Sequence, residues 1–234
     1  MLASVSRALP RRFATIPALR SPTLSRFFAS TSAVLDSSMK DEYGEMTSSG
    51  LTYTHPTPFT LENTATIPHA SLCYNTYGTL NKAGSNVLLV THALTGNSQL
   101  DGWWGDMLGP GRPFDTDKYF VVCCNILGSC YGSTSPRSPN PANYGKPYGI
   151  DFPDVSVRDT IALQFHCLSS IGVKSIKSVI GGSFGGMQTL EAMFHSSPKL
   201  TVESAIPIAC GAEHTAWQIA ISGETLTLRD ERNK

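Results

Sequence analysis

The stretch G-G-S-F-G-G-M-Q, residues 181–188, decides the fold of this chain. It follows an apolar run at 176–180 and precedes a segment with helical spacing, so the expected order is strand, turn and helix. A G-x-S-x-G motif in that context is typical of a nucleophile elbow, a sharp turn that lifts a serine hydroxyl above the end of a sheet. The neighbouring glycines leave room for such a turn. The sequence therefore predicts that Ser183 is a nucleophile.

The acid and the histidine that would activate Ser183 are missing from their usual places. In chains with this elbow, the acid and then the histidine follow the serine. Asp230 is the only aspartate after Ser183, and no histidine follows it. His195 stands about three turns along the next helix, roughly 18 Å away by helical rise, which is out of reach. His214 follows a neighbouring strand and has only Glu213 beside it as an orienting carboxylate. We therefore assign neither acid nor base.

Charge and composition exclude several classes of function. Basic and acidic residues number 18 each, a balance that gives no support to nucleic-acid binding or to a basic membrane-binding patch. We find no run of residues with the length and apolarity of a membrane span. The six cysteines form no C-x-x-C pair and have no histidine at zinc spacing, so we predict no metal site. Cys123 and Cys124 lie in an apolar run and are expected to be small buried hydrophobes.

The two ends of the chain differ in composition from its middle. The first 35 residues contain five arginines, many serines and threonines and no acidic residue, which is typical of a mitochondrial transit peptide. We therefore expect a location in the mitochondrial matrix. The sequence also changes character abruptly after Ile221, which predicts a C-terminally truncated chain. The expected segments are a transit segment at 1–35, a linker at 36–60, a folded core at 61–221 and a divergent polar tail at 222–234.

Strands and helices are expected to alternate in the core. The expected strands are 69–77, 86–91, 119–125, 176–180 and 202–210. The expected helices are 156–171, 187–194 and a helix that begins at 212. Ser156 and Asp159 have capping-box character, and Gly172 should end the first of these helices. This alternation predicts an α/β fold with a mainly parallel sheet flanked by helices.

Attack by Ser183 on a carbonyl group creates an oxyanion, which needs hydrogen-bond donors. One donor is expected to be the backbone N–H of Phe184, directly after the nucleophile. The second is expected from the loop that follows the strand at 86–91, where Leu94 is the candidate. His92 in the same loop either orients this backbone or is a hydrogen-bonded structural residue.

Seven motifs occur in order between residues 60 and 221. They are H-A-L-T-G (92–96), G-W-W (102–104), G-P-G-R (109–112), D-T-D-K-Y-F-V-V (115–122), N-I-L-G-S-C-Y-G-S-T (125–134), F-P-D-V-S-V-R-D (152–159) and G-G-S-F-G-G-M-Q (181–188). With this ordered set the chain resembles the homoserine O-acetyltransferase family of the α/β-hydrolase superfamily. The resemblance implies an α/β-hydrolase fold in which this chain lacks the helical lid and the last strands.

The resemblance also implies a two-step reaction without a bound cofactor. Acetyl-CoA, as co-substrate, would acetylate Ser183. The hydroxyl of L-homoserine would then take the acetyl group, giving O-acetyl-homoserine for methionine biosynthesis. Phe184 replaces the methionine usual in the family, a change that a backbone donor tolerates. The implied partners are these small molecules, not nucleic acid or a membrane, and a homodimer is compatible with the resemblance.

Other interpretations stay open. An acyltransferase acting on L-serine in cysteine biosynthesis, a plain esterase and a non-catalytic remnant are the alternatives. The remnant would expose the strand at 202–210 as an apolar edge, which favours association. Trp103 and Trp104 either line an acyl-CoA entrance or pack beneath their loop. Tyr131 and Arg137, in the long loop at 128–149, either contact substrate or remain solvated.

Overall fold

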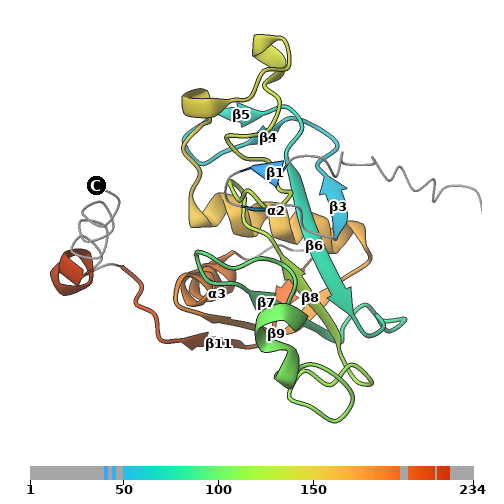
Figure 1. Cartoon of the computed structure of the whole chain (residues 1–234). Coiled ribbons are helices and arrows are strands. Elements are labelled where there is room, and N and C mark those ends of the chain that lie inside the picture. The colour runs from blue at the N-terminus through green and yellow to red at the C-terminus, as the bar shows by residue number, and fades with distance from the viewer. Residues whose placement is uncertain (1–39, 42–43, 46–49, 196–199, 214, 222–234) are drawn as a thin grey trace, which may run out of the picture. The chain divides into compact units, whose positions relative to one another are not determined.

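The computed structural model describes residues 40–41, 44–45, 50–195, 200–213 and 215–221. The predicted transit segment at 1–35 and the polar tail at 222–234 lie outside these residues, as do His214 and Asp230. Within the described part, no helix has both the length and the apolarity to cross a membrane. Figure 1 shows a central sheet with helices packed against it.

A seven-stranded sheet forms the centre of the described chain, in the order β10-β9-β7-β8-β6-β3, and β11 pairs with β9. Its strands are β3 (Leu51–Thr54), β6 (Ser71–Tyr77), β7 (Val87–Thr91), β8 (Phe120–Cys124), β9 (Ser175–Gly182), β10 (Thr201–Val202) and β11 (Ala205–Ile208). The strands from β7 to β11 pair in parallel, whereas β6 is antiparallel to β8 and to β3. The prediction of a mainly parallel sheet is confirmed. Two short antiparallel pairs also form, β1 (Lys40–Asp41) with β2 (Gly44–Glu45) and β4 (Phe59–Thr60) with β5 (Thr66–Ile67).

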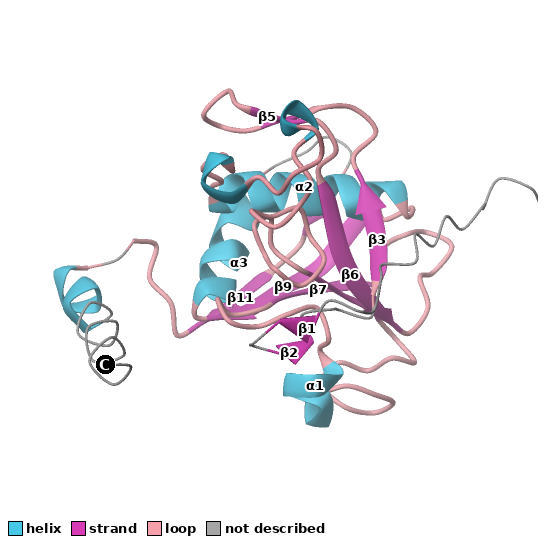
Figure 2. Ribbon diagram, turned by 45° about the horizontal axis from the view of Figure 1, so that its top comes forward, coloured by secondary structure: helices cyan, strands magenta, loops and turns pink. Residues whose placement is uncertain are grey.

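The helices cover both faces of the sheet. Their bounds are α1 (Asp101–Trp104), α2 (Val157–Ser170) and α3 (Phe184–Phe194), with short 3₁₀ turns η1 (Gly105–Met107), η2 (Pro141–Asn143) and η3 (Gly149–Asp151). Residues 216–221 are also helical. Figure 2 shows α2 and α3 together on one side of the sheet and α1 on the other. The sheet is therefore a middle layer, as expected for a parallel sheet.

Strand β7 is buried on both faces because its side chains alternate between two hydrophobic clusters. Val87 and Leu89 belong to the cluster that also contains side chains of α2 and α3. Leu88 and Val90 point to the opposite face and join a cluster with Leu100, just before α1. This two-sided burial explains why the strand is an unbroken apolar run in the sequence and not an alternating one.

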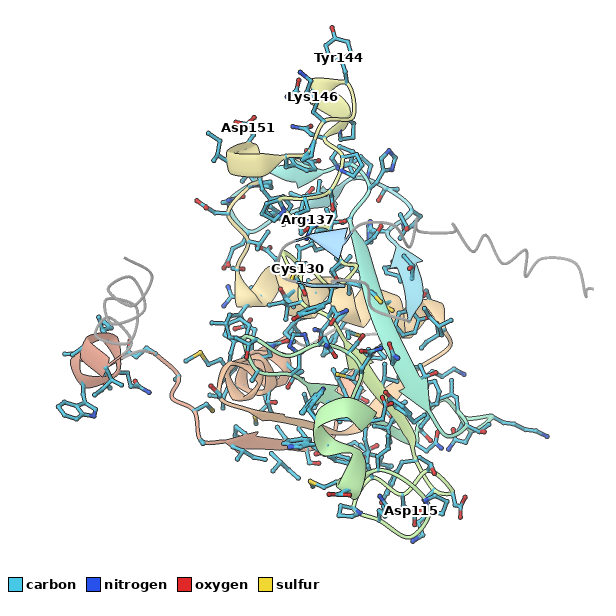
Figure 3. All side chains as sticks on the ribbon, viewed as in Figure 1. Asp115, Cys130, Arg137, Tyr144, Lys146 and Asp151 are labelled. Atoms are coloured by element: carbon cyan, nitrogen blue, oxygen red, sulfur yellow. The ribbon has the colours of Figure 1, made fainter. Side chains whose placement is uncertain are left out.

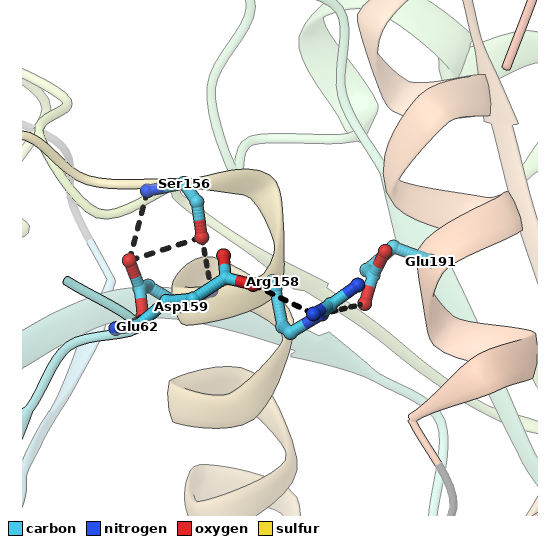
Figure 4. A network of polar contacts seen from close by, with 5 residues as sticks. All are labelled: Glu62, Ser156, Arg158, Asp159 and Glu191. Atoms are coloured by element: carbon cyan, nitrogen blue, oxygen red, sulfur yellow. Dashed lines mark hydrogen bonds and ion pairs between the residues drawn. The ribbon is translucent and has the colours of Figure 1, made fainter. Parts of the chain in front are cut away.

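Helix α2 begins and ends where the sequence predicts. The Ser156 hydroxyl accepts a hydrogen bond from the Asp159 backbone N–H (3.1 Å), and the Ser156 N–H donates to the Asp159 carboxylate (2.9 Å). Figure 4 shows this reciprocal capping box. The last residue of α2 is Ser170, and Gly172 follows with a φ of 93°, the left-handed conformation that glycine adopts at helix ends.

Arg158, one residue inside α2, joins three elements. Its guanidinium donates to Glu191 on α3 (2.7 Å) and to Glu62 in the β4–β5 hairpin (2.6 Å) (Figure 4). More than half of the Arg158 side chain is exposed, so each ion pair contributes little to stability. The two pairs instead fix how the hairpin and α3 are oriented around the start of α2.

The structure differs from the sequence prediction in several segments, and the helix predicted to begin at 212 begins at residue 216. The predicted linker at 36–60 contains β3, a four-residue, mostly exposed edge strand that pairs with β6 and leaves little local signal. The predicted strand at 202–210 is divided into β10 and β11, because residues 203 and 204 leave the regular pairing with β9. Helix α3 begins at Phe184, three residues before the predicted start, because tertiary packing overrides the low helix propensity of its two glycines.

Candidate active site

Ser183 lies at the tip of a tight turn between β9 and α3. Strand β9 ends at Gly182 and α3 begins at Phe184, so a single residue makes the whole connection. The backbone of Ser183 has φ 56° and ψ −121°, a region that a residue with a side chain rarely occupies. The Ser183 N–H donates to the carbonyl of Ile208 in β11 (3.0 Å), and its side chain is exposed. The predicted strand–turn–helix geometry is confirmed, while the role of Ser183 as nucleophile stays a prediction.

The turn is possible because α3 approaches the end of β7 very closely. A Cβ atom added to Gly185 would overlap the backbone carbonyl of Thr91, and one added to Gly181 would overlap the Thr91 hydroxyl. A Cβ on Gly186 would lie 2.6 Å from the sulfur of Cys210. Side chains at these three positions would push the helix away from the sheet. Glycine is therefore required at these positions because the neighbouring segments lie too close for a side chain.

A buried threonine holds β7 against the elbow. The Thr91 hydroxyl donates to the carbonyl of Gly185 (2.7 Å) and lies 3.1 Å from the hydroxyl of Thr189 on α3. Thr189 also donates to the Gly185 carbonyl (3.0 Å). These bonds satisfy polar groups that would otherwise be buried without partners. The sequence analysis did not identify Thr91. The available signal was a polar residue at the end of a fully buried strand.

His92, the next residue, is buried and structural. Its Nδ1 lies 2.7 Å from the carbonyl oxygen of Ala93, so Nδ1 carries the proton and donates it. The other ring nitrogen, Nε2, is buried and has no hydrogen-bond partner among the described residues. Burial lowers the pKa of His92, because a charged ring would be poorly solvated there. Both interpretations left open by the sequence fit this geometry, because a structural histidine bonded to the Ala93 carbonyl also orients the loop backbone.

The two predicted oxyanion donors are both available. Leu94 is the second residue of a turn that the Gly96 N–H closes onto the Ala93 carbonyl (2.9 Å), and its side chain is 68% exposed. Phe184 is the first residue of α3, where a backbone N–H has no intrahelical acceptor. Within the described residues, neither N–H donates a hydrogen bond. Their roles in binding an oxyanion remain predictions.

His195 and two aspartates that precede Ser183 in the chain, Asp115 and Asp159, have structural partners. His195 follows the last turn of α3, and its ring packs on Phe165 (centroids 5.3 Å apart), as its distance from the serine predicted. Asp115 pairs with Lys118 (2.8 Å), and Asp159 caps α2. In Figure 3, Asp115 lies at the opposite end of the core from Arg137 and Cys130 of the long loop. The geometry brings none of these residues into contact with Ser183.

The tryptophans pack beneath their loop. The Trp103 indole N–H donates to the carbonyl of Asn97 (3.1 Å), and its ring lies 4.9 Å from that of Trp104. The Trp104 ring in turn lies 5.7 Å from Phe114, which belongs to the hydrophobic cluster on this face of the sheet. The packing interpretation accounts for these contacts.

A mainly parallel sheet whose central strand turns through a strained serine into a helix is the architecture of the α/β hydrolases. A family profile described as the alpha/beta hydrolase fold matches residues 86–195. The chain therefore has the fold of this superfamily. Among proteins with this fold, it is similar to homoserine O-acetyltransferases. It is 47% identical over 168 residues to the "Homoserine O-acetyltransferase" of Chloroherpeton thalassium, an alignment that covers 71% of this chain and 43% of the relative.

Solved structures agree with this placement. The homoserine O-acetyltransferase from Bacillus anthracis is 32% identical with a TM-score of 0.58, and the match covers 62% of this chain and 42% of the other. An acetylester hydrolase from Corynebacterium glutamicum is 28% identical with a TM-score of 0.62, covering 72% of this chain and 46% of the other. The chain spans about half the length of the curated relatives it matches.

Alanine at Gly185 should destabilise the fold, whereas alanine at Gly182 should be tolerated. Gly185→Ala places a Cβ against the Thr91 backbone, which cannot move aside, and we expect a loss of about 1–3 kcal/mol of unfolding free energy. This range is the net loss that remains after the gain of roughly 1 kcal/mol from replacing a helical glycine. In the matched control Gly182→Ala, the nearest atom to the new Cβ is 4.0 Å away. Thermal unfolding of both variants tests this; equal stability would contradict the close approach.

The buried neutral His92 should make the fold less stable in mild acid. Its pKa is lowered in the folded state, so the stabilisation is complete above its ordinary value of 6.5 and is lost as pH falls below it. His92→Asn keeps a donor at the Nδ1 position but cannot titrate. We expect the free energy of unfolding to fall more steeply between pH 7 and pH 5 in the wild type than in the variant. Urea unfolding at each pH measures this free energy. If it depends on pH equally in the wild type and in His92→Asn, His92 does not titrate in this range.

Proposed function

We propose that this chain provides the nucleophile of an acyltransferase that moves an acetyl group from acetyl-CoA to the hydroxyl of L-homoserine. The observation that carries the proposal is the elbow, which presents the exposed Ser183 hydroxyl next to Phe184, whose backbone N–H has no acceptor among the described residues. The acetyl group and the acceptor come from the names of the relatives, which are homoserine O-acetyltransferases at 43–48% identity. Acetyl-CoA as donor is what the resemblance in sequence implies. Such a reaction belongs to methionine biosynthesis.

In the first step, the oxygen of Ser183 attacks the thioester carbonyl of acetyl-CoA. The C–O bond forms, the carbonyl oxygen becomes an oxyanion, and the N–H groups of Phe184 and Leu94 bind it. The N-terminus of α3 adds a favourable potential for this charge. Collapse of the intermediate breaks the C–S bond, and coenzyme A leaves with a proton. The serine proton must pass to a base, and we assign none among the described residues.

In the second step, the hydroxyl of homoserine attacks the acetyl-serine ester. The same two N–H groups bind the second oxyanion, the ester bond to Ser183 breaks, and the serine recovers its proton. The elbow is open to solvent in the described residues, because the Ser183 side chain is exposed. Water can reach the same ester, so transfer to an amino acid requires that the acceptor compete with water.

Acetylation of Ser183 tests the proposal directly. Incubation with acetyl-CoA should add one acetyl group to the peptide that contains residues 181–188, and Ser183→Ala should abolish the modification. Addition of L-homoserine should remove the acetyl group faster than L-serine does, as the names of the relatives favour. Mass spectrometry of the digested protein measures both steps. Acetylation elsewhere, or an unchanged level in Ser183→Ala, would contradict the role of the elbow.

An esterase is the second candidate, favoured by the similarity to an acetylester hydrolase and by the exposed nucleophile. It differs from a transferase in its acceptor. An esterase releases acetate from acetyl-Ser183 at the same rate with and without homoserine, whereas a transferase forms O-acetyl-homoserine instead of acetate. Product analysis in the same experiment separates the two.

We also propose a location in the mitochondrial matrix and a homodimer as the assembly. The arginine-rich, acid-free composition of residues 1–35 supports the location, although the relatives named above are bacterial. Sequencing of the mature N-terminus from isolated mitochondria tests it. A terminus near residue 29 is expected, since R-F-F at 26–28 resembles a processing site, and an intact Met1 would contradict the proposal.

A further inference from the structure

Two glutamine side chains are completely buried between α2 and α3. Gln164 lies in the middle of α2 and Gln188 in the second turn of α3, and both side chains have an exposed fraction of 0%. Burial of an amide costs free energy unless its polar atoms are hydrogen-bonded. An apolar side chain of the same size would avoid this cost. The presence of both amides in the core therefore calls for an explanation in what they contact.

The two amides form a chain of hydrogen bonds that ends on the loop after β7. The Gln164 amide nitrogen donates to the carbonyl oxygen of Gln188 (3.3 Å). With its oxygen engaged in this way, Gln188 turns its amide nitrogen to the loop, where it donates to the backbone carbonyl of His92 (3.1 Å). Gln164 therefore sets the orientation of the Gln188 amide, and Gln188 contacts the loop.

The bond to His92 completes the fixation of the backbone that leads to Leu94. Thr91 is held on Gly185 through its hydroxyl, and the Ala93 carbonyl accepts from the ring of His92. With the His92 carbonyl bonded to Gln188, each of the three residues before Leu94 has a defined polar partner. Because these three residues are held, the direction of the Leu94 N–H is also set.

We propose that Gln188 is a positioning residue, which holds the Leu94 N–H at the correct place relative to the Phe184 N–H. The inference rests on the proposed function, in which these two groups bind the oxyanion beside Ser183. Phe184 and Gln188 belong to the same helix, one turn apart. Helix α3 thus carries one donor in its own backbone and fixes the loop of the other through a side chain. Displacement of such a donor by about 1 Å can slow a reaction roughly 100-fold.

Gln188→Met tests the inference, because methionine keeps the volume of the side chain but cannot donate a hydrogen bond. We expect the rate at which a fluorophosphonate probe labels Ser183 to fall about 10- to 100-fold, since this reaction also builds charge on an oxygen at the donor site. We also expect faster hydrogen exchange of the amides at 92–96. The control Ile161→Val lies in α2 and in the hydrophobic core, and it should lower stability without changing either measurement.

Gln188→Glu adds a signature that a loss of packing cannot produce. A buried carboxyl has a raised pKa, and its protonated form can donate to the His92 carbonyl as the amide does. The labelling rate of this variant should approach the wild-type rate at pH 6.5 and decline towards pH 9 relative to the wild type. The labelling rate of Gln188→Met, divided by that of the wild type, should stay constant over the same pH range.

The outcomes separate the two proposals. If the wild type is not labelled at Ser183, the proposed function fails, while hydrogen exchange still reports on the loop. If labelling is unchanged in Gln188→Met, or if the exchange at 92–96 matches that of Ile161→Val, the positioning role is overturned and Gln188 is a packing residue. Slow labelling together with fast exchange in Gln188→Met, and pH-dependent recovery in Gln188→Glu, support it.

Discussion

The hydrogen bond from the Thr91 hydroxyl to the Gly185 carbonyl joins the end of β7 to the first turn of α3, and the rest of the site depends on it. Because the helix touches β7 there, residues 181 and 185 have no room for a side chain, and Cys210 restricts residue 186 in the same way. The same contact brings the loop after β7 beside the elbow, where its carbonyl groups can be reached from α3. The strained serine, the glycines and the oxyanion loop are thus consequences of one close approach between a strand and a helix.

Much of the fold could be predicted from the sequence because the decisive signals are local. The unbroken apolar run of β7, the capping box at Ser156 and the glycine after α2 each follow from short-range chemistry, and the structure confirms them. Strand β3 could not be found in this way, since its exposed threonines are typical of a loop and its pairing with β6 depends on residues far along the chain. The early start of α3 was missed for a related reason, because packing on β7 rather than propensity sets it.

The residues of the candidate site also fall into two groups, those that a local motif predicts and those that depend on contacts between distant segments. Ser183 and the two backbone donors are attached to motifs, so their positions could be assigned from the sequence. Thr91 and Gln188 form hydrogen bonds between segments almost a hundred residues apart, and no local pattern identifies the partners of these bonds. Gln188 stands inside the G-G-M-Q motif but carries no signal of its own, and only its burial and its partner in the structure distinguish it from a surface glutamine. Polar residues in a sheet core are therefore where sequence reasoning is least informative.

The N–H of Ser183 bonds to the carbonyl of Ile208, so the elbow is anchored to a strand that comes later in the chain. During translation, the ribosome releases β7, β9 and α3 before β11 exists. Until Ile208 emerges and pairs with β9, the serine lacks the anchor that supports its unfavourable backbone conformation. The nascent chain can therefore hold β7, β9 and α3 while its serine is still in a relaxed turn, and the elbow is anchored only once β11 has paired with β9.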